Sequence, residues 1–272
     1  MLLAVRHRTT YRYDPAVAGV AMRLKLFPSR FDGQKPRRWR VSLNGAAVKP
    51  DFTNGWGDEV ATLFLRGGVP EAEVIAEGEV ETHDLAGVLR GFREALKPGV
   101  CLRETPRTRA DAAIAELARE ADASGGSVLS RAHALQDLVS SRIAYVPGAT
   151  DHGTTAAQAL AAGKGVCQDH AHVIIAGARS LGWPARYVAG YYLAHIEGGD
   201  VATHAWAEVW VPDLGWVGFD ASNDICPTAD YIRVCSGLDA ADAAPLRGHA
   251  EGVAAETLDV EVGVAPVAQT QQ

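Results

Sequence analysis

Residues 165–171 read Gly165-Val166-Cys167-Gln168-Asp169-His170-Ala171 and join the end of one helical pattern to the start of another. Apolar residues then recur at helical spacing as far as Gly182, which predicts a helix over residues 167–181 with Cys167 at its first position. The apolar face of this helix consists of Ala171, Ile174, Ile175 and Ala178. The fold is thus expected to be organised around a helix whose first residue is a cysteine.

The position of Cys167 suits a nucleophile. At a helix start, the unpaired backbone N–H groups and the positive end of the helix dipole favour the thiolate, which is the reactive form of cysteine. The same N–H groups can donate to the oxyanion formed when sulfur attacks a carbonyl, and Gly165 would let a substrate backbone approach closely. The alternative is a small buried cysteine that begins a helix and has no chemical role.

Helices precede this segment and strands follow it. Helical periodicity covers residues 105–123, 130–142 and 154–162, and alternating patterns cover 186–193, 204–211 and 215–220. A loop rich in alanine, glycine and aspartate is expected over 236–253, and one more strand over 258–267. This order predicts an α+β domain in which helices pack on an antiparallel sheet.

The first 84 residues have a different character. Short alternating segments at 2–13, 21–27, 37–43, 60–65 and 74–82 are separated by turn-rich pieces such as Asn44-Gly45 and Gly67-Gly68. Strands at this spacing predict a small antiparallel β-sandwich. We therefore divide the chain into an N-terminal β domain at 1–85 and a catalytic domain at 86–272.

A histidine and a carboxylate complete the candidate site. In the segment 203–210, strict alternation places His204, Trp206 and Glu208 on one strand face and leaves alanines on the other. His204 is placed to act as a base toward a thiol, although a histidine hydrogen-bonded in a half-buried sheet would look the same. Glu208 is interpreted as pairing with an arginine such as Arg186.

Asp220 ends the strand that follows, across a hairpin at 212–215. A carboxylate that accepts a hydrogen bond from imidazole fixes the tautomer and favours the imidazolium. A symmetric turn would pair Asp220 with Ala207 and not with His204, so a bulge, a shifted register or a diagonal contact is needed. Asp220 is also a natural start for the turn that ends at Asn223.

These blocks together resemble bacterial transglutaminase-like proteins. The resemblance rests on the cysteine block at 165–171, the histidine block at 203–209, the aspartate block at 215–220 and the flanking segments 181–191 and 245–248. The segments Thr10-Tyr11-Arg12-Tyr13 and Leu24-Lys25-Leu26-Phe27-Pro28 are similar to the β domain that precedes this core in bacteria. Nearly the whole chain is covered.

The resemblance implies a papain-like core with Cys167 as nucleophile, His204 as general base and acid, and Asp220 as the group that orients the imidazole. It also implies places for Gln168 and Trp206 near the oxyanion or the substrate entrance. The chain departs from the family pattern at His170, where an aromatic residue is common, and at 220–223, where Asp-Pro-Thr-Asn is common. His170 could add a titrating group near the thiol.

The function that these residues predict is cysteine-dependent acyl transfer on the amide bonds of a peptide or protein, through a thioester and without a cofactor. Hydrolysis, as in a cysteine peptidase or amidase, is preferred. The alternatives are transfer from protein glutamine to an amine, and a binding module without chemistry, because the triad itself does not choose the acceptor.

A metal site is disfavoured. His170 and His172, with His152, His195 or Cys167, could suggest ligands, but residues two apart on a helix point in different directions. The remaining cysteines, Cys101, Cys226 and Cys235, form no CxxC pair and are interpreted as packed or free thiols.

Composition narrows the class of protein. The chain has 272 residues, 47% hydrophobic and 22% charged, and a formal charge of −7, so it carries no basic field for nucleic acid or anionic lipid. Four cysteines are too few for a disulfide scaffold. No signal-peptide pattern or apolar stretch of about 18 residues is found, so a cytoplasmic protein is expected, and its oligomeric state stays open.

Overall fold

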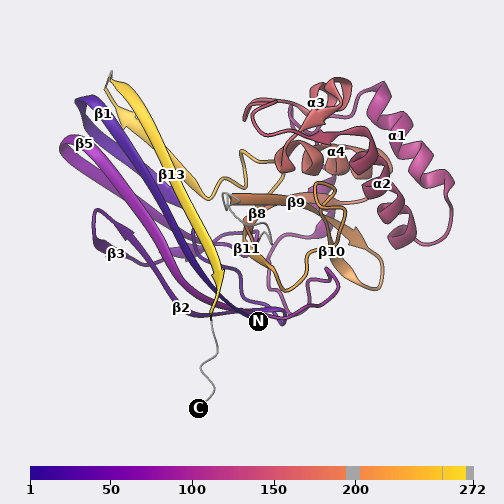
Figure 1. Cartoon of the computed structure of the whole chain (residues 1–272), viewed down its shortest axis with the longest axis horizontal. Helices are drawn as coiled ribbons and strands as arrows, with labels where there is room; N and C mark the ends of the chain where they lie inside the picture. Colours follow the sequence, from indigo (N-terminus) through magenta and orange to yellow (C-terminus); the bar gives the residue numbers. More distant parts are fainter. Residues whose placement is uncertain (194–202, 253, 268–272) are drawn as a thin grey trace, which may run out of the picture.

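The computed structural model describes residues 1–193, 203–252 and 254–267. It places a long curved antiparallel sheet beside a smaller sheet that is covered by helices (Figure 1). This arrangement confirms the α+β fold predicted from the sequence. Among the described residues, no helix is both long and apolar enough to cross a membrane.

The long sheet has the order β12-β1-β5-β2-β3, with β13 also paired to β1 and β4 to β5. Its strands are β1 (Leu2–Leu24), β2 (Gln34–Leu43), β3 (Ala46–Val48), β4 (Phe52–Thr53), β5 (Glu59–Thr82), β12 (Leu246–Glu251) and β13 (Ala255–Pro266). Side chains of β1, β2 and β5 fill its own hydrophobic cluster, which includes Met22, Val41 and Val74. The sheet therefore curls over a core, as the predicted sandwich would.

The strand predicted at 37–43 is found as β2, but the other four predicted short strands were wrong as separate strands. The segments 2–13 and 21–27 belong largely to the single strand β1, and 60–65 and 74–82 belong to β5. Irregular register between Arg12 and Gly19 of β1 lets the paired strands bend while they stay hydrogen-bonded. The two layers of the predicted sandwich are thus halves of one continuous sheet.

The end of the chain returns to this sheet. β12 pairs with residues 19–24 of β1, and β13 pairs with residues 3–14, both antiparallel. The loop expected over 236–253 was therefore wrong where it contains β12, while the strand expected over 258–267 is found as β13. The boundary at residue 85 stays a prediction, but the sheet itself takes strands from both sides of it.

The second part of the molecule is a four-stranded sheet with the order β10-β9-β8-β11, packed under helices. The helices are α1 (Ala112–Ala123), α2 (Val128–Arg142), α3 (Ala156–Ala162) and α4 (Cys167–Ser180), and a 3₁₀ turn, η1, spans Pro98–Leu102. The strands are β8 (Ala185–Tyr192), β9 (Thr203–Val211), β10 (Gly215–Phe219) and β11 (Tyr231–Gly237), and a short parallel pair joins β6 (Ala144–Tyr145) to β7 (Lys164–Gly165).

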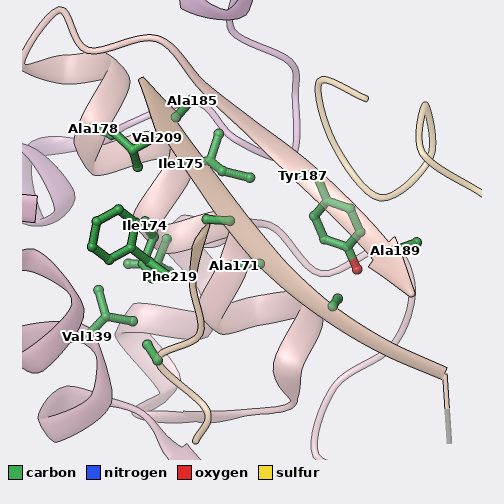
Figure 2. Close-up of a cluster of buried hydrophobic side chains, with 14 of the residues drawn as sticks. Val139, Ala171, Ile174, Ile175, Ala178, Ala185, Tyr187, Ala189, Val209 and Phe219 are labelled. Carbon is green, nitrogen blue, oxygen red and sulfur yellow. The ribbon is translucent and has the colours of Figure 1, made fainter. Parts of the chain in front are cut away.

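Helix α4 lies at the centre of this part. Its predicted apolar face is buried, and Ile174 and Ile175 lie in one hydrophobic cluster with Ala185 of β8 and Val209 of β9 (Figure 2). Burial of such side chains is the main favourable term in folding. The sheet and the helix cluster therefore hold the start of α4, and Cys167 with it, at a fixed place.

Candidate active site

The loop before α4 is shaped by local hydrogen bonds. α3 ends at Gly163, whose φ of 62° is the left-handed conformation usual at helix ends. α4 then begins at Cys167, as predicted, and the Asp169 carboxylate caps it: Oδ2 accepts from the backbone N–H of Val166 at 2.8 Å and from Thr150 Oγ1 at 2.6 Å. The cap fixes the backbone that carries the cysteine.

The backbone N–H groups of Cys167 and Gln168 form no hydrogen bond within the part of the chain that the structure describes. Cys167 is partly exposed, as is Gln168. Gly165 is buried, and a Cβ atom there would lie 2.7 Å from Oδ2 of Asp169. A glycine is needed here because a side chain would displace the capping carboxylate, and its role in letting a substrate backbone approach stays a prediction.

His204 lies near the start of β9. The alternate residues Ala205, Ala207 and Val209 are buried in the main core, as predicted. Nε2 of the His204 imidazole lies 2.6 Å from Oδ2 of Asp220, and Cys167 lies near enough to His204 to contribute to the rise of its pKa. Because Nε2 faces the carboxylate, Nδ1 is the ring nitrogen left for the thiol. The structure thus brings the three predicted residues together at one site.

The register of the hairpin differs from the one expected. Ala207 pairs with Phe219 and not with Asp220, because the turn has three residues between the paired Val211 and Gly215. Continued by one residue, this register sets Asp220 opposite Trp206, two residues from His204 on the same strand face. The bond between His204 and Asp220 is therefore the diagonal contact considered from the sequence.

The electrostatics of the pair follow from these contacts. Burial alone would lower the pKa of His204, but the hydrogen bond and charge of Asp220, together with the nearby Cys167, outweigh it and raise the pKa from 6.5 to about 10. Burial would raise the pKa of Asp220, but the hydrogen bond and charge of His204, with smaller contributions from Ser222 and Tyr231, lower it to about 2. At neutral pH the pair is an imidazolium facing a carboxylate.

Aromatic side chains surround the imidazole. The His204 ring lies 6.4 Å from the Trp206 ring, 5.3 Å from Tyr192 and 5.8 Å from Tyr231, measured between centroids. Trp206 is only 3% exposed and packs beside the histidine, and its place near the oxyanion or the substrate entrance stays a prediction. A shell of this kind shields the imidazolium and carboxylate from water.

Comparisons with known proteins identify the family of the chain. Residues 115–221, which include all three site residues, match the model of the transglutaminase-like superfamily, and residues 3–81 match that of the bacterial transglutaminase-like N-terminal region. An uncharacterized protein of Mycobacterium leprae is 30% identical over 98% of this chain and 99% of its own. The chain belongs to the transglutaminase-like superfamily. Membership supports a cysteine-dependent activity.

Two further proteins are similar to this transglutaminase-like protein, one over about half of its sequence and one over nearly all of its fold. An uncharacterized protein of Mycobacterium tuberculosis is 38% identical over 48% of this chain, and the match spans 46% of that protein. The crystal structure of a candidate cysteine protease from Cytophaga hutchinsonii superimposes with a TM-score of 0.73 at 22% identity, over 99% of this chain and 92% of that one. The second likeness shows that the two-part fold is shared.

Other residues singled out in the sequence have structural partners. His170 is buried, with Nδ1 2.9 Å from the carbonyl oxygen of Val166 and Nε2 2.9 Å from that of Ile143. Glu208 forms an ion pair with Arg186 at 2.6 Å, as predicted from the sequence, and a second one with Arg233 at 2.8 Å. No cluster of three metal-binding side chains occurs among the described residues, and His195 lies outside them.

Sequence reasoning missed several groups at the site. Tyr231 Oη and Asn223 Nδ2 donate to Oδ2 of Asp220, at 2.7 and 2.8 Å, and Ser222 Oγ donates to Oδ1 at 2.6 Å. Ser222 and Asn223 lie in the turn that was predicted after Asp220, and their side chains were the available signal. Tyr231 comes eleven residues after Asp220, and no spacing rule links the two.

Proposed function

We propose that this chain transfers acyl groups from amide or peptide bonds through a thioester on Cys167, with water as the acceptor. The observation that carries the proposal is that Cys167, at the start of α4, lies beside His204, whose imidazole is hydrogen-bonded to Asp220. Because the pKa of His204 is raised to about 10, the imidazole is charged at neutral pH and can balance a thiolate.

The reaction would run in two halves. The Cys167 thiolate attacks the amide carbon, and the N–H groups of Cys167 and Gln168, which form no hydrogen bond among the described residues, would donate to the oxyanion. The C–N bond breaks, His204 gives its proton to the leaving amine, and a thioester remains. Water then attacks the thioester, His204 takes a proton from it, and the carboxylic acid leaves as the thiolate re-forms.

Water is the preferred acceptor because it requires no binding site of its own, so the triad can complete hydrolysis unaided. A peptide or protein amide is the substrate class that the thioester chemistry fits. In this proposal the Asp220 carboxylate stays ionised and holds the imidazolium in place during both halves.

The first test needs no substrate. Iodoacetamide labelling at pH 7, resolved for each cysteine by mass spectrometry, should modify Cys167 first. Burial raises the pKa of Cys101 and of Cys226 to about 11 and that of Cys235 further, so these three thiols should stay unmodified and serve as internal controls.

The His204→Ala variant should slow the labelling of Cys167 by at least about tenfold, because the imidazolium that stabilises the thiolate is gone. His249→Ala changes an exposed histidine and should have no effect. Equal labelling rates in the wild type and in His204→Ala would reject the catalytic pair and favour a binding module.

Once labelling shows that His204 activates the Cys167 thiol, glutamine-containing peptides incubated with and without a primary amine distinguish hydrolysis from amine transfer. Cys167→Ala should abolish both reactions.

A further inference from the structure

The Asp220 carboxylate accepts hydrogen bonds from other side chains in addition to His204. Oδ2 receives Nε2 of His204 at 2.6 Å, Oη of Tyr231 at 2.7 Å and Nδ2 of Asn223 at 2.8 Å. The side chain of Asp220 is 1% exposed, so bulk water cannot replace a donor that is lost. Each donor therefore helps to set the direction in which the carboxylate faces.

Tyr231 is the donor that is held most firmly by the fold. It is the first residue of β11, where it pairs with Tyr192 of β8, and it is 5% exposed. Its ring packs edge-on against His204 and Trp206, with centroids 5.8 and 5.5 Å apart. By contrast, Asn223 lies in the turn after Asp220, where its side chain is more exposed.

Burial and the charge of Asp220 raise the pKa of Tyr231, so the phenol keeps its proton and can donate throughout the working range of pH. Tyr231 also lies beyond residue 221, where the match to the superfamily model ends. Its contact with the site comes from a strand on the far side of β8, which the three sequence blocks do not include.

We propose that Tyr231 is a positioning residue whose hydroxyl group fixes the Asp220 carboxylate in the orientation that meets His204. The inference rests on the proposed function and adds a fourth side chain to its triad. Tyr231 acts through Asp220 and does not touch the thiol. Without the hydroxyl group, the carboxylate loses one of the donors that favour its ionised form, and it is freer to turn away from the imidazolium.

The test compares the rate constant for iodoacetamide labelling of Cys167 at pH 7 in wild type, Tyr231→Phe, Asp220→Ala and the double variant. Tyr231→Phe keeps the ring and its packing and removes only the hydrogen bond. We expect it to lower the rate about tenfold, the effect of one hydrogen bond to a charged group. In the Asp220→Ala background the same change should have no further effect, because its target is gone.

Tyr13→Phe is the matched control. Tyr13 is 5% exposed, like Tyr231, and packs in the hydrophobic cluster of the long sheet, apart from the site. This variant should label at the wild-type rate. As a second readout, the acid side of the rate–pH profile should move to higher pH in Tyr231→Phe by about one unit and stay in place in Tyr13→Phe.

The outcomes separate this inference from the proposed function. His204-dependent labelling in the wild type, with no loss in Tyr231→Phe, would overturn the role of Tyr231 and leave the proposed function standing. An equal loss in both Asp220 backgrounds would overturn it as well, since the tyrosine would then act through packing. If labelling of Cys167 does not depend on His204 at all, the proposed function fails, and the inference fails with it.

Discussion

At the scale of single residues, His204 makes the stability of the fold depend on pH. Its pKa is raised from 6.5 to about 10, so it contributes stability that is fully present below pH 6.5 and is lost as the pH rises toward 10. The difference in unfolding free energy between wild type and His204→Gln should therefore shrink from pH 6.5 to pH 10. Urea denaturation at a series of pH values measures this difference.

His249→Gln, on the exposed face of β12, is the control and should follow the wild type at every pH. A difference in unfolding free energy between wild type and His204→Gln that stays constant between pH 6.5 and 10 would mean that His204 is not held as an imidazolium.

Asp220 affects stability at the acidic end of the pH range. Its pKa is lowered from 3.8 to about 2, so its contribution to stability is present above pH 3.8 and is lost as the pH falls through 2.

The residues that the sequence could predict are those that local patterns mark. A cysteine at a helix start, a histidine on an alternating strand and an aspartate at a strand end were each recognisable, and the structure brings Cys167, His204 and Asp220 together. The diagonal contact was one of three possibilities left open by the sequence, and the phenol of Tyr231 was not recognisable. They depend on a three-residue turn and on the placement of β11, which only the assembled sheet determines.

At the scale of elements, the start of α4 is built around one close contact. A methyl group on residue 165 would meet Cβ and Oδ2 of Asp169, each at 2.7 Å. Gly165→Ala should therefore displace the capping carboxylate and destabilise the protein by about 1–3 kcal/mol, measured by urea denaturation. It should also slow the labelling of Cys167, because the helix start that carries the thiol is disturbed.

Gly99→Ala is the matched control for that change. A Cβ at Gly99 has no neighbour within 4 Å, so this variant should differ from the wild type by less than about 0.5 kcal/mol. Full stability in Gly165→Ala would show that the Asp169 side chain can move without loss, and the cap would then not be what positions Cys167.

Helices were easier to predict than strands for a physical reason. The helical periodicity at 167–181 is a local property, and the observed α4 ends within one residue of the prediction. The long strands β1 and β5 pair on both sides of Gly67 and Gly68, which have positive φ and no partner in β1. The local signal for a turn therefore marks an irregularity inside a long strand, and pairing on both sides of it makes the strand continue.

At the scale of the whole molecule, the two ends of the chain meet in one sheet, and buried charges join that sheet to the site-bearing part. Lys25 follows β1, and its Nζ lies 3.2 Å from Oδ2 of Asp58 and 3.0 Å from the carbonyl oxygen of Asp242. Oδ1 of Asp58 accepts from the backbone N–H of Ser236, next to the end of β11. The Lys25 and Asp58 side chains are 2% and 1% exposed.

A buried ion pair of this kind is costly to break on one side only, because the partner is left charged without water. Lys25→Met should destabilise the protein by about 3–5 kcal/mol in urea denaturation, and the added change Asp58→Leu should recover much of that loss. Arg6→Met, which breaks the exposed pair with Glu77, is the control and should cost less than about 1 kcal/mol. If the loss of unfolding free energy in Lys25→Met is as small as that in Arg6→Met, the Lys25–Asp58 pair does not hold the long sheet against the rest of the molecule. If instead both parts of the molecule lose stability together in Lys25→Met, and the labelling of Cys167 changes only once unfolding begins, the sheet and the site-bearing part form one cooperative unit.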